Sequence, residues 1–517
     1  MKQFILLFSA FILIACSACH KNIDGAEALR MEMPQHQTNS PQSPPPPPPP
    51  PASEAEYFQL DSEELPTPGD RYNEITENPF MPVSQQAVST FSIDADGASY
   101  ANVRRFLQQN STIPPAGAIR TEELINYFDL DYSYENAAHP ISLNGEVSQC
   151  PWNEQNKLVR IGIKGMPLPK NDLPPANFVF LIDVSGSMAS EDKLEMLKSG
   201  FKLFVDELTS EDRVAIVTYA GSAGVVLEST AGDRKTTIKN AINRLGSGGS
   251  TAGAAGILTA YEIAREHFIE GGNNRIVIGT DGDFNVGPAS QDELIEIIEK
   301  ERDFGIFLTV LGVGRGNLND GMLEQIANNG NGTYEYIDNV EQLRKVFIYG
   351  YEKFYTVAKD VKVQVEFDPD VVQSYRLIGY ENRILSEEDF EDDTKDAGEI
   401  GANQNITALY EIVPAGATLS SQAPTFTIDF RYKLPNSDTS IPLELPVFDR
   451  GLSFEEASGF TQFTASVALF SMLLRESEYS GEGTYDDILR WLDRLNLRDK
   501  HGFKAEFRDL VARGNSL

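Results

Sequence analysis

The strongest constraint on the fold is an alternation of short apolar runs with amphipathic stretches between residues 175 and 355. Each apolar run has the length of one strand, as in NFVFLID, RVAIVTYA, NRIVIGT and GIFLTVLGVG. Apolar side chains recur with helical spacing in the stretches between these runs, at residues 193–208, 234–245, 253–267 and 291–302. Continuous apolar strands that alternate with helices predict an α/β domain, with a mostly parallel sheet covered by helices on both faces.

The segments on either side of this block have a different periodicity. Residues 140–166 and 356–450 alternate apolar and polar side chains with a period of two, which is typical of antiparallel strands. We expect these two segments to form one antiparallel β-sandwich, so that the α/β domain is inserted in the sandwich or followed by it. Helical spacing returns at 451–517, and residues 76–139 are expected to form one strand and two helices.

Polar side chains that suit a metal ion follow the predicted strands. Asp183 ends the first strand and is followed by Ser185 and Ser187, while Asp281 comes directly after a later strand. Thr251 lies in a glycine-rich loop that leads into a helix. Ligands of open parallel sheets bind at the carboxyl ends of the strands, so these side chains are expected to converge on one edge. Their hard oxygen atoms suit Mg²⁺ best, with Mn²⁺ or Ca²⁺ as alternatives.

This set of residues resembles the metal-ion-dependent adhesion site of the von Willebrand factor type A (VWA) fold, which is a Rossmann-like α/β fold. The family pattern has D-x-S-x-S after the first strand, a threonine in a later loop and an aspartate in T-D-G, and all three parts are present. The resemblance implies that Ser185, Ser187 and Thr251 coordinate the cation through their hydroxyls. It implies that Asp183 and Asp281 act directly or through water, and that a partner protein supplies a carboxylate to the cation.

The flanking segments carry a second resemblance. Stretches such as STFSIDADGASYANVRRFL, EELINYF and PWNEQNKLVRIGIKG are similar to a bacterial lipoprotein family that frames a VWA domain with characteristic N- and C-terminal regions. This resemblance covers nearly all of the chain after residue 75, and it implies the architecture more firmly than it implies a biological role.

The N-terminal residues have the features of a lipoprotein leader. Lys2 precedes an apolar run of roughly a dozen residues, which is typical of a signal peptide and short for a membrane span. The run ends in Leu-Ile-Ala-Cys16, which resembles the bacterial lipobox and implies cleavage before Cys16 and acylation of its thiol. We therefore expect a lipid anchor in a membrane of the cell envelope, with the body in the periplasm or at the cell surface. Ser17 favours the outer membrane over the inner.

A stiff tether is expected between this anchor and the folded body. Residues 44–51 are all proline, a composition that favours an extended polyproline II spacer. These patterns together divide the chain into a signal peptide (1–15), a lipid-anchored proline-rich tether (16–75), an N-terminal region (76–139), strands that join the β domain (140–166), the VWA domain (175–355), the β-sandwich (356–450) and C-terminal helices (451–517).

The overall charge excludes one class of partner. The chain has 43 basic and 77 acidic side chains, which gives a formal net charge of −34. A surface of this sign repels nucleic acid, so we expect no nucleic-acid partner. The same surface attracts cations, which agrees with a metal site.

Catalysis is not expected. A serine hydrolase needs a base beside its nucleophile, and the 5 histidines lie in no recognisable motif. Ser185 does not lie in G-x-S-x-G, and neither H-E-x-x-H nor a phosphate-binding G-x-x-x-x-G-K-[ST] is present. The favoured function is therefore binding of a partner protein through the metal. An envelope assembly factor with a stabilising metal is the alternative, and a metal-dependent hydrolase is less favoured.

Three other acidic features are open to interpretation. Asp94, Asp96 and Gly97 resemble the start of a calcium loop, but its later ligands are missing, so we interpret them as turn and cap residues. Residues 387–399 contain eight carboxylates, for which a solvated loop is the default and a second cation site is conceivable. Asp283 occupies a position where many VWA domains carry glutamate, and it either tunes metal hydration or lies on the surface.

Overall fold

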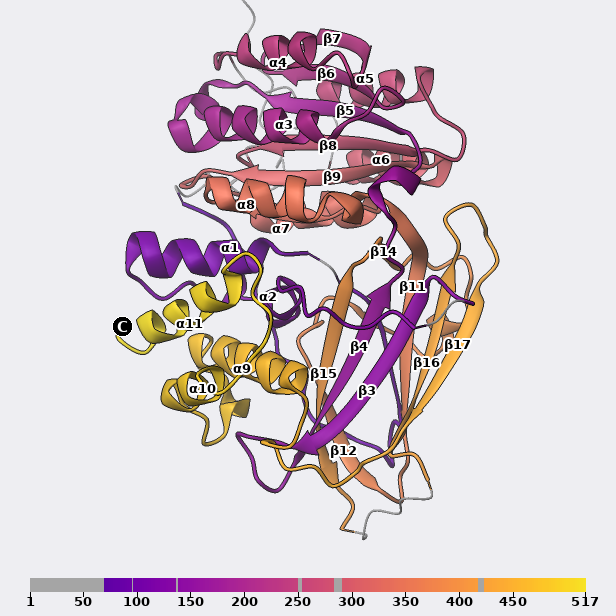
Figure 1. The fold of residues 1–517 in the computed structure, drawn as a ribbon, viewed down its shortest axis with the longest axis vertical. Coiled ribbons are helices and arrows are strands. Elements are labelled where there is room, and N and C mark those ends of the chain that lie inside the picture. The colour runs from indigo at the N-terminus through magenta and orange to yellow at the C-terminus, as the bar shows by residue number, and fades with distance from the viewer. Residues whose placement is uncertain (1–68, 95, 136–137, 250–252, 283–290, 417–422) are drawn as a thin grey trace, which may run out of the picture. The chain divides into compact units, whose positions relative to one another are not determined.

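The computed structural model describes residues 69–517, apart from 95, 136–137, 250–252, 283–290 and 417–422. The central block is a sheet of six strands in the order β10-β9-β8-β5-β6-β7 (Figure 1). The strands are β5 (Ala176–Asp183), β6 (Arg213–Tyr219), β7 (Ala223–Ala231), β8 (Asn273–Thr280), β9 (Ile306–Val313) and β10 (Tyr334–Ile337). Neighbouring strands are parallel, except that β7 runs antiparallel to β6 at the edge.

Helices cover both faces of this sheet. They are α3 (Met196–Glu207), α4 (Lys235–Asn243), α5 (Gly253–Glu266), α6 (Gln291–Phe304), α7 (Asp320–Asn329) and α8 (Val340–Arg344). Phe178 and Phe180 of β5 pack with α3, α4 and α8, while Val179 and Leu181 pack with α5, α6 and α7. Successive side chains of a strand point to opposite faces, so a continuous apolar run is required to fill both layers. The predicted fold class is confirmed for this block.

The flanking strands form a β-sandwich. One sheet has the order β1-β12-β15-β4-β3 and the other β13-β2-β11-β16-β17, with β14 pairing to β11. The bounds are β1 (Met81–Pro82), β2 (Val88–Ser92), β3 (Ile141–Gln149), β4 (Lys157–Gly165), β11 (Thr356–Phe367), β12 (Val372–Ile378), β13 (Ile384–Leu385), β14 (Gly398–Gly401), β15 (Asn405–Pro414), β16 (Phe426–Lys433) and β17 (Ile441–Val447). All pairs are antiparallel, and the inward side chains of both sheets share one core.

The α/β block is an insertion in this sandwich. β4 pairs with β15 from Lys157 to Lys164, so strands that precede the block lie in the same sheet as strands that follow it. β2 of the N-terminal region also joins the sandwich, between β13 and β11. The sandwich therefore contains strands from three separate parts of the chain.

Helices from both ends of the described chain share a separate core. They are α1 (Ala98–Arg105), α2 (Thr121–Asn126), α9 (Gly459–Leu474), α10 (Tyr485–Leu492) and α11 (Phe503–Gly514). The side chain of Ser458 caps the start of α9, and Thr484 and Asp487 form a capping box on α10. α1 lies between the α/β block and the C-terminal helices (Figure 1). Among the described residues, the helices lack the length and apolar character that a bilayer span requires.

Candidate metal centre

Two carboxylates lie at adjacent strand ends of the VWA block. Asp183 is the last residue of β5, and Asp281 comes directly after β8. The two strands are parallel neighbours, with Ile182 opposite Gly279, so the chain brings both carboxylates to the same edge of the sheet. Both side chains are fully buried. The carboxyl-terminal edge of the sheet therefore holds two of the predicted metal ligands side by side.

The two serines lie beside Asp183. The backbone N–H of Ser185 donates to Oδ1 of Asp183 at 2.8 Å, and the hydroxyl of Thr280 donates to its Oδ2 at 3.2 Å. Oγ of Ser185 and Oγ of Ser187 are 2.9 Å apart. Ser185 is buried and Ser187 is exposed, so the hydroxyl pair extends from the interior to the solvent.

This donor set fits a small divalent cation. Mg²⁺ binds oxygen at about 2.0–2.1 Å in octahedral geometry, in which adjacent ligands lie about 2.9 Å from each other. The separation of the two serine hydroxyls matches that edge. Two neutral hydroxyls and two carboxylates are also the oxygen ligands that Mg²⁺ and Mn²⁺ prefer.

The two carboxyl groups have opposite electrostatic environments. Burial raises the pKa of Asp183, hydrogen bonds from Ser185 oppose this, and the charge of Asp281 adds to it. Burial alone would also raise the pKa of Asp281, but hydrogen bonds from Lys193 and Asn317 and the charge of Lys193 hold it below its ordinary value. Asp281 is therefore the more firmly ionised of the pair.

Lys193 is a further residue of the site, and no motif of the sequence indicated it. Its Nζ donates to Oδ2 of Asp281 and to Oδ1 of Asn317, both at 2.9 Å, and its side chain is 8% exposed. Lys193 is spaced four and eight residues from the buried Leu197 and Phe201. A lysine on the apolar face of a helical segment is a signal that could have identified it, because such a lysine needs a buried partner.

The loops around the site are held by backbone contacts. The N–H of Gly186 donates to the carbonyl of Gly249 at 3.1 Å, and the N–H of Gly248 donates to that of Val184 at 2.7 Å. Gly282 has a φ of +88°, and a Cβ there would approach the backbone nitrogen of Asn319 to 2.5 Å, so only glycine fits this turn. Three residues of the sequence predictions lie outside the described residues. They are the predicted ligand Thr251, the nearby acidic residue Asp283 and the predicted lipidation site Cys16.

The histidines within the described part of the chain do not serve the serines as bases. His139 pairs with the hydroxyl of Tyr432 at 2.9 Å in the sandwich, and His501 stacks on Tyr349. His267 directly follows α5, which leads back to the amino end of the sheet. The serines therefore have surroundings that suit ligands better than nucleophiles.

The acidic run at 387–399 packs along the sandwich. Asp393 pairs with Arg431 at 3.3 Å, and its carbonyl accepts from Lys433 at 2.6 Å. Asp396 and Glu399 lie with Asp360 of β11, one carboxylate oxygen from each within 4.8 Å of the others. Asp396 pairs with Arg302 at 2.7 Å and Asp360 with Lys433 at 2.8 Å. Basic side chains of the neighbouring elements therefore balance much of the run.

Comparison with known proteins identifies the parts of the chain. Residues 177–347 match the family model of the von Willebrand factor type A domain, and residues 66–160 match a model described as von Willebrand factor. Residues 352–517 match the model of the C-terminal region of the uncharacterized protein YfbK. None of these three descriptions names a catalytic activity.

Individual relatives cover different shares of the chain. YfbK of Escherichia coli K12 is 40% identical over 465 residues, which are 85% of this chain and 80% of the relative. The solved structure of BatB from Bacteroides thetaiotaomicron is 25% identical and covers 35% of this chain and 98% of its own, with a TM-score of 0.30. A von Willebrand factor type A structure from Catenulispora acidiphila is 14% identical and covers 73% and 90%, with a TM-score of 0.41. By the extent and identity of the YfbK match, this chain belongs to the bacterial YfbK family of VWA-domain proteins.

Proposed function

We propose that this protein is a lipid-anchored protein of the cell envelope that binds a partner protein through a divalent cation. The proposed ligands are Asp183, Ser185, Ser187, Thr251 and Asp281, and Mg²⁺ is the preferred ion. The observation that carries the proposal is the pair of serine hydroxyls, 2.9 Å apart, beside two buried carboxylates at the open edge of the VWA sheet.

The chemistry of these residues suits binding through a shared cation. A bound cation would supply a Lewis-acidic position at which a carboxylate of the partner protein completes the ligand shell. Hydroxyl ligands are neutral, so they leave the cation electrophilic toward that carboxylate. Both oxygens of Asp183 already accept hydrogen bonds, so its main task is to orient Ser185. The exposed Ser187 marks the side from which the partner approaches.

The proposed location rests on the N-terminal sequence. The leader ending at Cys16 and the proline-rich stretch that follows are the features of an anchored and tethered protein. The prediction is that Cys16→Ser moves the protein out of the membrane fraction, which fractionation of cells would show. The outer membrane is the favoured location, because aspartate is absent from the position after Cys16.

The partner is best sought in intact cells. We expect chemical crosslinking of the full-length protein to trap a partner protein when Mg²⁺ is present and to lose it with EDTA. Ser187→Ala removes one proposed ligand and should abolish the crosslink. Ser190→Ala is the matched control, since this exposed serine lies three residues away and its hydroxyl donates to Asp192. A crosslink that survives both EDTA and Ser187→Ala would contradict the proposal.

The alternative is an envelope assembly factor that the metal only stabilises. The burial of Asp183, Ser185 and Asp281 favours this reading, because a cation there would hold two strand ends and a loop together. In that case Mg²⁺ raises the melting temperature of the wild type and not of Ser187→Ala, while the crosslinked partners remain the same with and without EDTA.

A further inference from the structure

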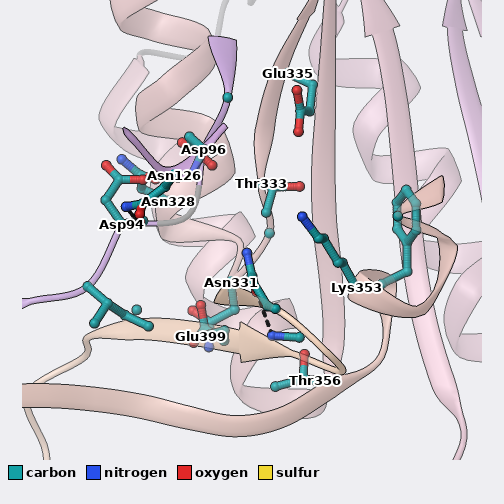
Figure 2. Close-up of a pocket in the computed structure, with 18 of the residues that line it drawn as sticks. Asp94, Asp96, Asn126, Asn328, Asn331, Thr333, Glu335, Lys353, Thr356 and Glu399 are labelled. Atoms are coloured by element: carbon teal, nitrogen blue, oxygen red, sulfur yellow. Dashed lines mark hydrogen bonds between the residues drawn. The ribbon is translucent and has the colours of Figure 1, made fainter. Parts of the chain in front are cut away.

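A polar cavity lies between the VWA block and the regions that flank it. Its volume is about 180 Å³, and its walls include the segment before α1, the turn after α7, the segment between α8 and β11, and β14. Asp96 and Asn126 lie on one side of the cavity, and Lys353 lies across from them (Figure 2). The cavity is separate from the candidate metal centre, whose described ligands do not line it.

Three buried oxygen atoms of residues that line the cavity have no hydrogen-bond partner among the described residues. They are Oδ2 of Asp96, Oδ1 of Asn331 and Oε1 of Glu399. Asp96 and Asn331 are 2% and 6% exposed, and the other oxygen of Asp96 accepts from the N–H of Tyr334 at 2.8 Å. Burial raises the pKa of Asp96 well above its ordinary value, so this carboxyl group lacks a compensating cation. Buried acceptors are nearly always paired, so these three require ordered water or a ligand that brings N–H or O–H groups.

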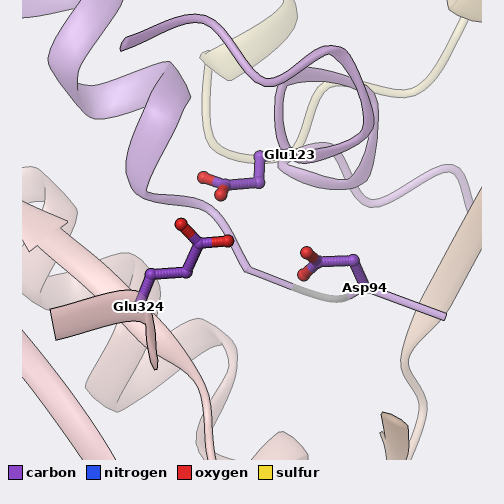
Figure 3. A group of neighbouring side chains, drawn as sticks. All are labelled: Asp94, Glu123 and Glu324. Carbon is purple, nitrogen blue, oxygen red and sulfur yellow. The ribbon is translucent and has the colours of Figure 1, made fainter. Parts of the chain in front are cut away.

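The neighbouring acidic side chains have their partners within the protein. Asp94, Glu123 and Glu324 point toward one another, and one oxygen of each lies within 4.8 Å of the others (Figure 3). Arg383 contacts Asp94 at 3.0 Å. Arg120 contacts Glu123 and lies 3.2 Å from Glu324. This buried group is therefore paired internally, unlike the three oxygens described above.

Two lysines that line the cavity have ammonium groups without an acceptor. Within the described part of the chain, Nζ of Lys345 and Nζ of Lys353 take part in no hydrogen bond or ion pair. Nζ of Lys345 lies over the ring of Tyr127, 4.0 Å from its centre. Burial, followed by the like charge of Lys353, lowers the pKa of Lys345 to about 8. Unpaired cations in the interior are costly, so an anionic group of a ligand would be favourable beside them.

We propose that this cavity binds a small zwitterion with an ammonium group and a carboxylate, as in a free amino acid. The ammonium group would donate to Asp96 and Asn331, and the carboxylate would accept from Lys345 and Lys353. An ammonium group brings only donors and a carboxylate only acceptors, so the two groups match the two kinds of unpaired atom in the walls. Hydrogen bonds between charged partners are the stronger ones, which favours a zwitterion over a neutral sugar.

The volume of the cavity limits the size of this ligand. Sites for drug-sized molecules have volumes of about 300–1,000 Å³. The cavity has about 180 Å³, so it suits a smaller molecule such as one amino acid.

A ligand in this cavity would contact the VWA block and both of its flanking regions. Asn331 and Lys345 belong to the block, Asp96 to the N-terminal region and Glu399 to the sandwich. Binding would therefore hold the block against the rest of the body. The inference does not rest on the proposed partner binding, because it concerns other residues and another ligand.

Binding of free amino acids to the full-length protein tests the proposal. Thermal unfolding is measured with each of the standard L-amino acids at millimolar concentration. EDTA is present, so that no carboxylate can bind a metal ion at the first site. We expect at least one amino acid to raise the melting temperature. Calorimetry then compares this amino acid with its decarboxylated amine and its deaminated acid, and each analogue should bind at least about tenfold more weakly because it lacks one charged group.

Two variants assign the charged groups of the ligand to the residues of the cavity. Asp96→Asn and Lys353→Met should each weaken binding of the amino acid at least about tenfold. Each loss should be confined to ligands that carry the matching group. Asp96→Asn is therefore expected to leave binding of the deaminated acid unchanged, and Lys353→Met that of the decarboxylated amine.

Controls separate this site from a general effect of charge. Asp438→Asn and Lys239→Met make the same changes outside the cavity and should leave binding unchanged. Near-UV circular dichroism without ligand checks the fold of each variant, and Lys353→Met provides the second reading if Asp96→Asn does not fold. The proposal is overturned if no amino acid raises the melting temperature, which would leave water in the cavity. It is also overturned if either analogue binds as well as the amino acid, or if both cavity variants bind normally.

Discussion

Lys193 gives a prediction at the scale of one residue. Its ammonium group lies 2.9 Å from Asp281, so it opposes a dication at the same carboxylate. We expect Lys193→Met to lower the melting temperature in EDTA, because Asp281 loses its buried partner, and to bind Mg²⁺ about tenfold more tightly. Calorimetry and thermal unfolding measure both effects. Lys170→Met is the control, since Lys170 is 53% exposed. Weaker Mg²⁺ binding by Lys193→Met would show instead that the lysine positions Asp281.

The same residues show what the sequence could predict of the site. Asp183, Ser185, Ser187 and Asp281 were predicted because each lies at or shortly after the end of an apolar strand, and strand ends in a parallel sheet share an edge. Lys193 has no such marker, because a helix rather than a strand end brings it to Asp281. The buried group of Asp94, Glu123 and Glu324 was missed for a related reason. Its members are far apart in the chain, and only tertiary packing brings them together.

At the scale of an element, the acidic run gives a pH dependence. Partial burial raises the pKa of Asp396, whose side chain is 38% exposed, to about 7, against the opposing charge of Arg302 and with support from Asp360. Glu399 and Asp303 are the other charged neighbours. Between the ordinary aspartate pKa of 3.8 and about 7, the folded protein holds a proton that the unfolded chain has lost. Its stability therefore falls as pH rises through this range.

Asp396→Asn should flatten that dependence, because asparagine does not titrate. Urea unfolding at several pH values between 4 and 8 measures the effect. The quantity to compare is the urea concentration at the unfolding midpoint of the wild type and of the variant. The variant is expected to gain most relative to wild type at the upper end of the range. Asp438→Asn, the same change at a fully exposed carboxylate, should follow the wild-type profile. A wild-type profile for Asp396→Asn would contradict the assignment.

The elements themselves were largely predictable, whereas the order of the strands was predictable only in part. Apolar runs and period-two alternation identified the strands of the α/β block and of the sandwich, because each pattern reflects how many faces of a strand are buried. The antiparallel β7 at the edge and the place of β2 beside β11 did not follow from these patterns. Pairing partners depend on contacts between distant segments, and period alone says nothing about them.

At the scale of the whole molecule, Arg104 links the VWA block to the core of helices that α1 shares with α11. Arg104 lies on α1 and is 1% exposed. Its guanidinium group contacts Asp338 of the VWA block at 2.5 Å and Glu506 of α11 at 2.9 Å. Arg104→Met leaves Asp338 buried without its partner, and we expect a loss of about 3–5 kcal/mol of unfolding free energy. Because the variant loses this link, we expect calorimetry to show one unfolding transition for the wild type and two for the variant.

A second substitution separates the charge from the contact. Arg104→Met/Asp338→Leu replaces both partners with apolar groups, and such replacements are often neutral. We expect the double variant to regain most of the stability, whereas Arg490→Met, at a residue 54% exposed on α10, should have little effect. If Arg104→Met unfolds in one transition near the wild-type temperature, then the other contacts of α1 suffice to hold the VWA block in place. The orientation of the block would then depend on the packing of α1.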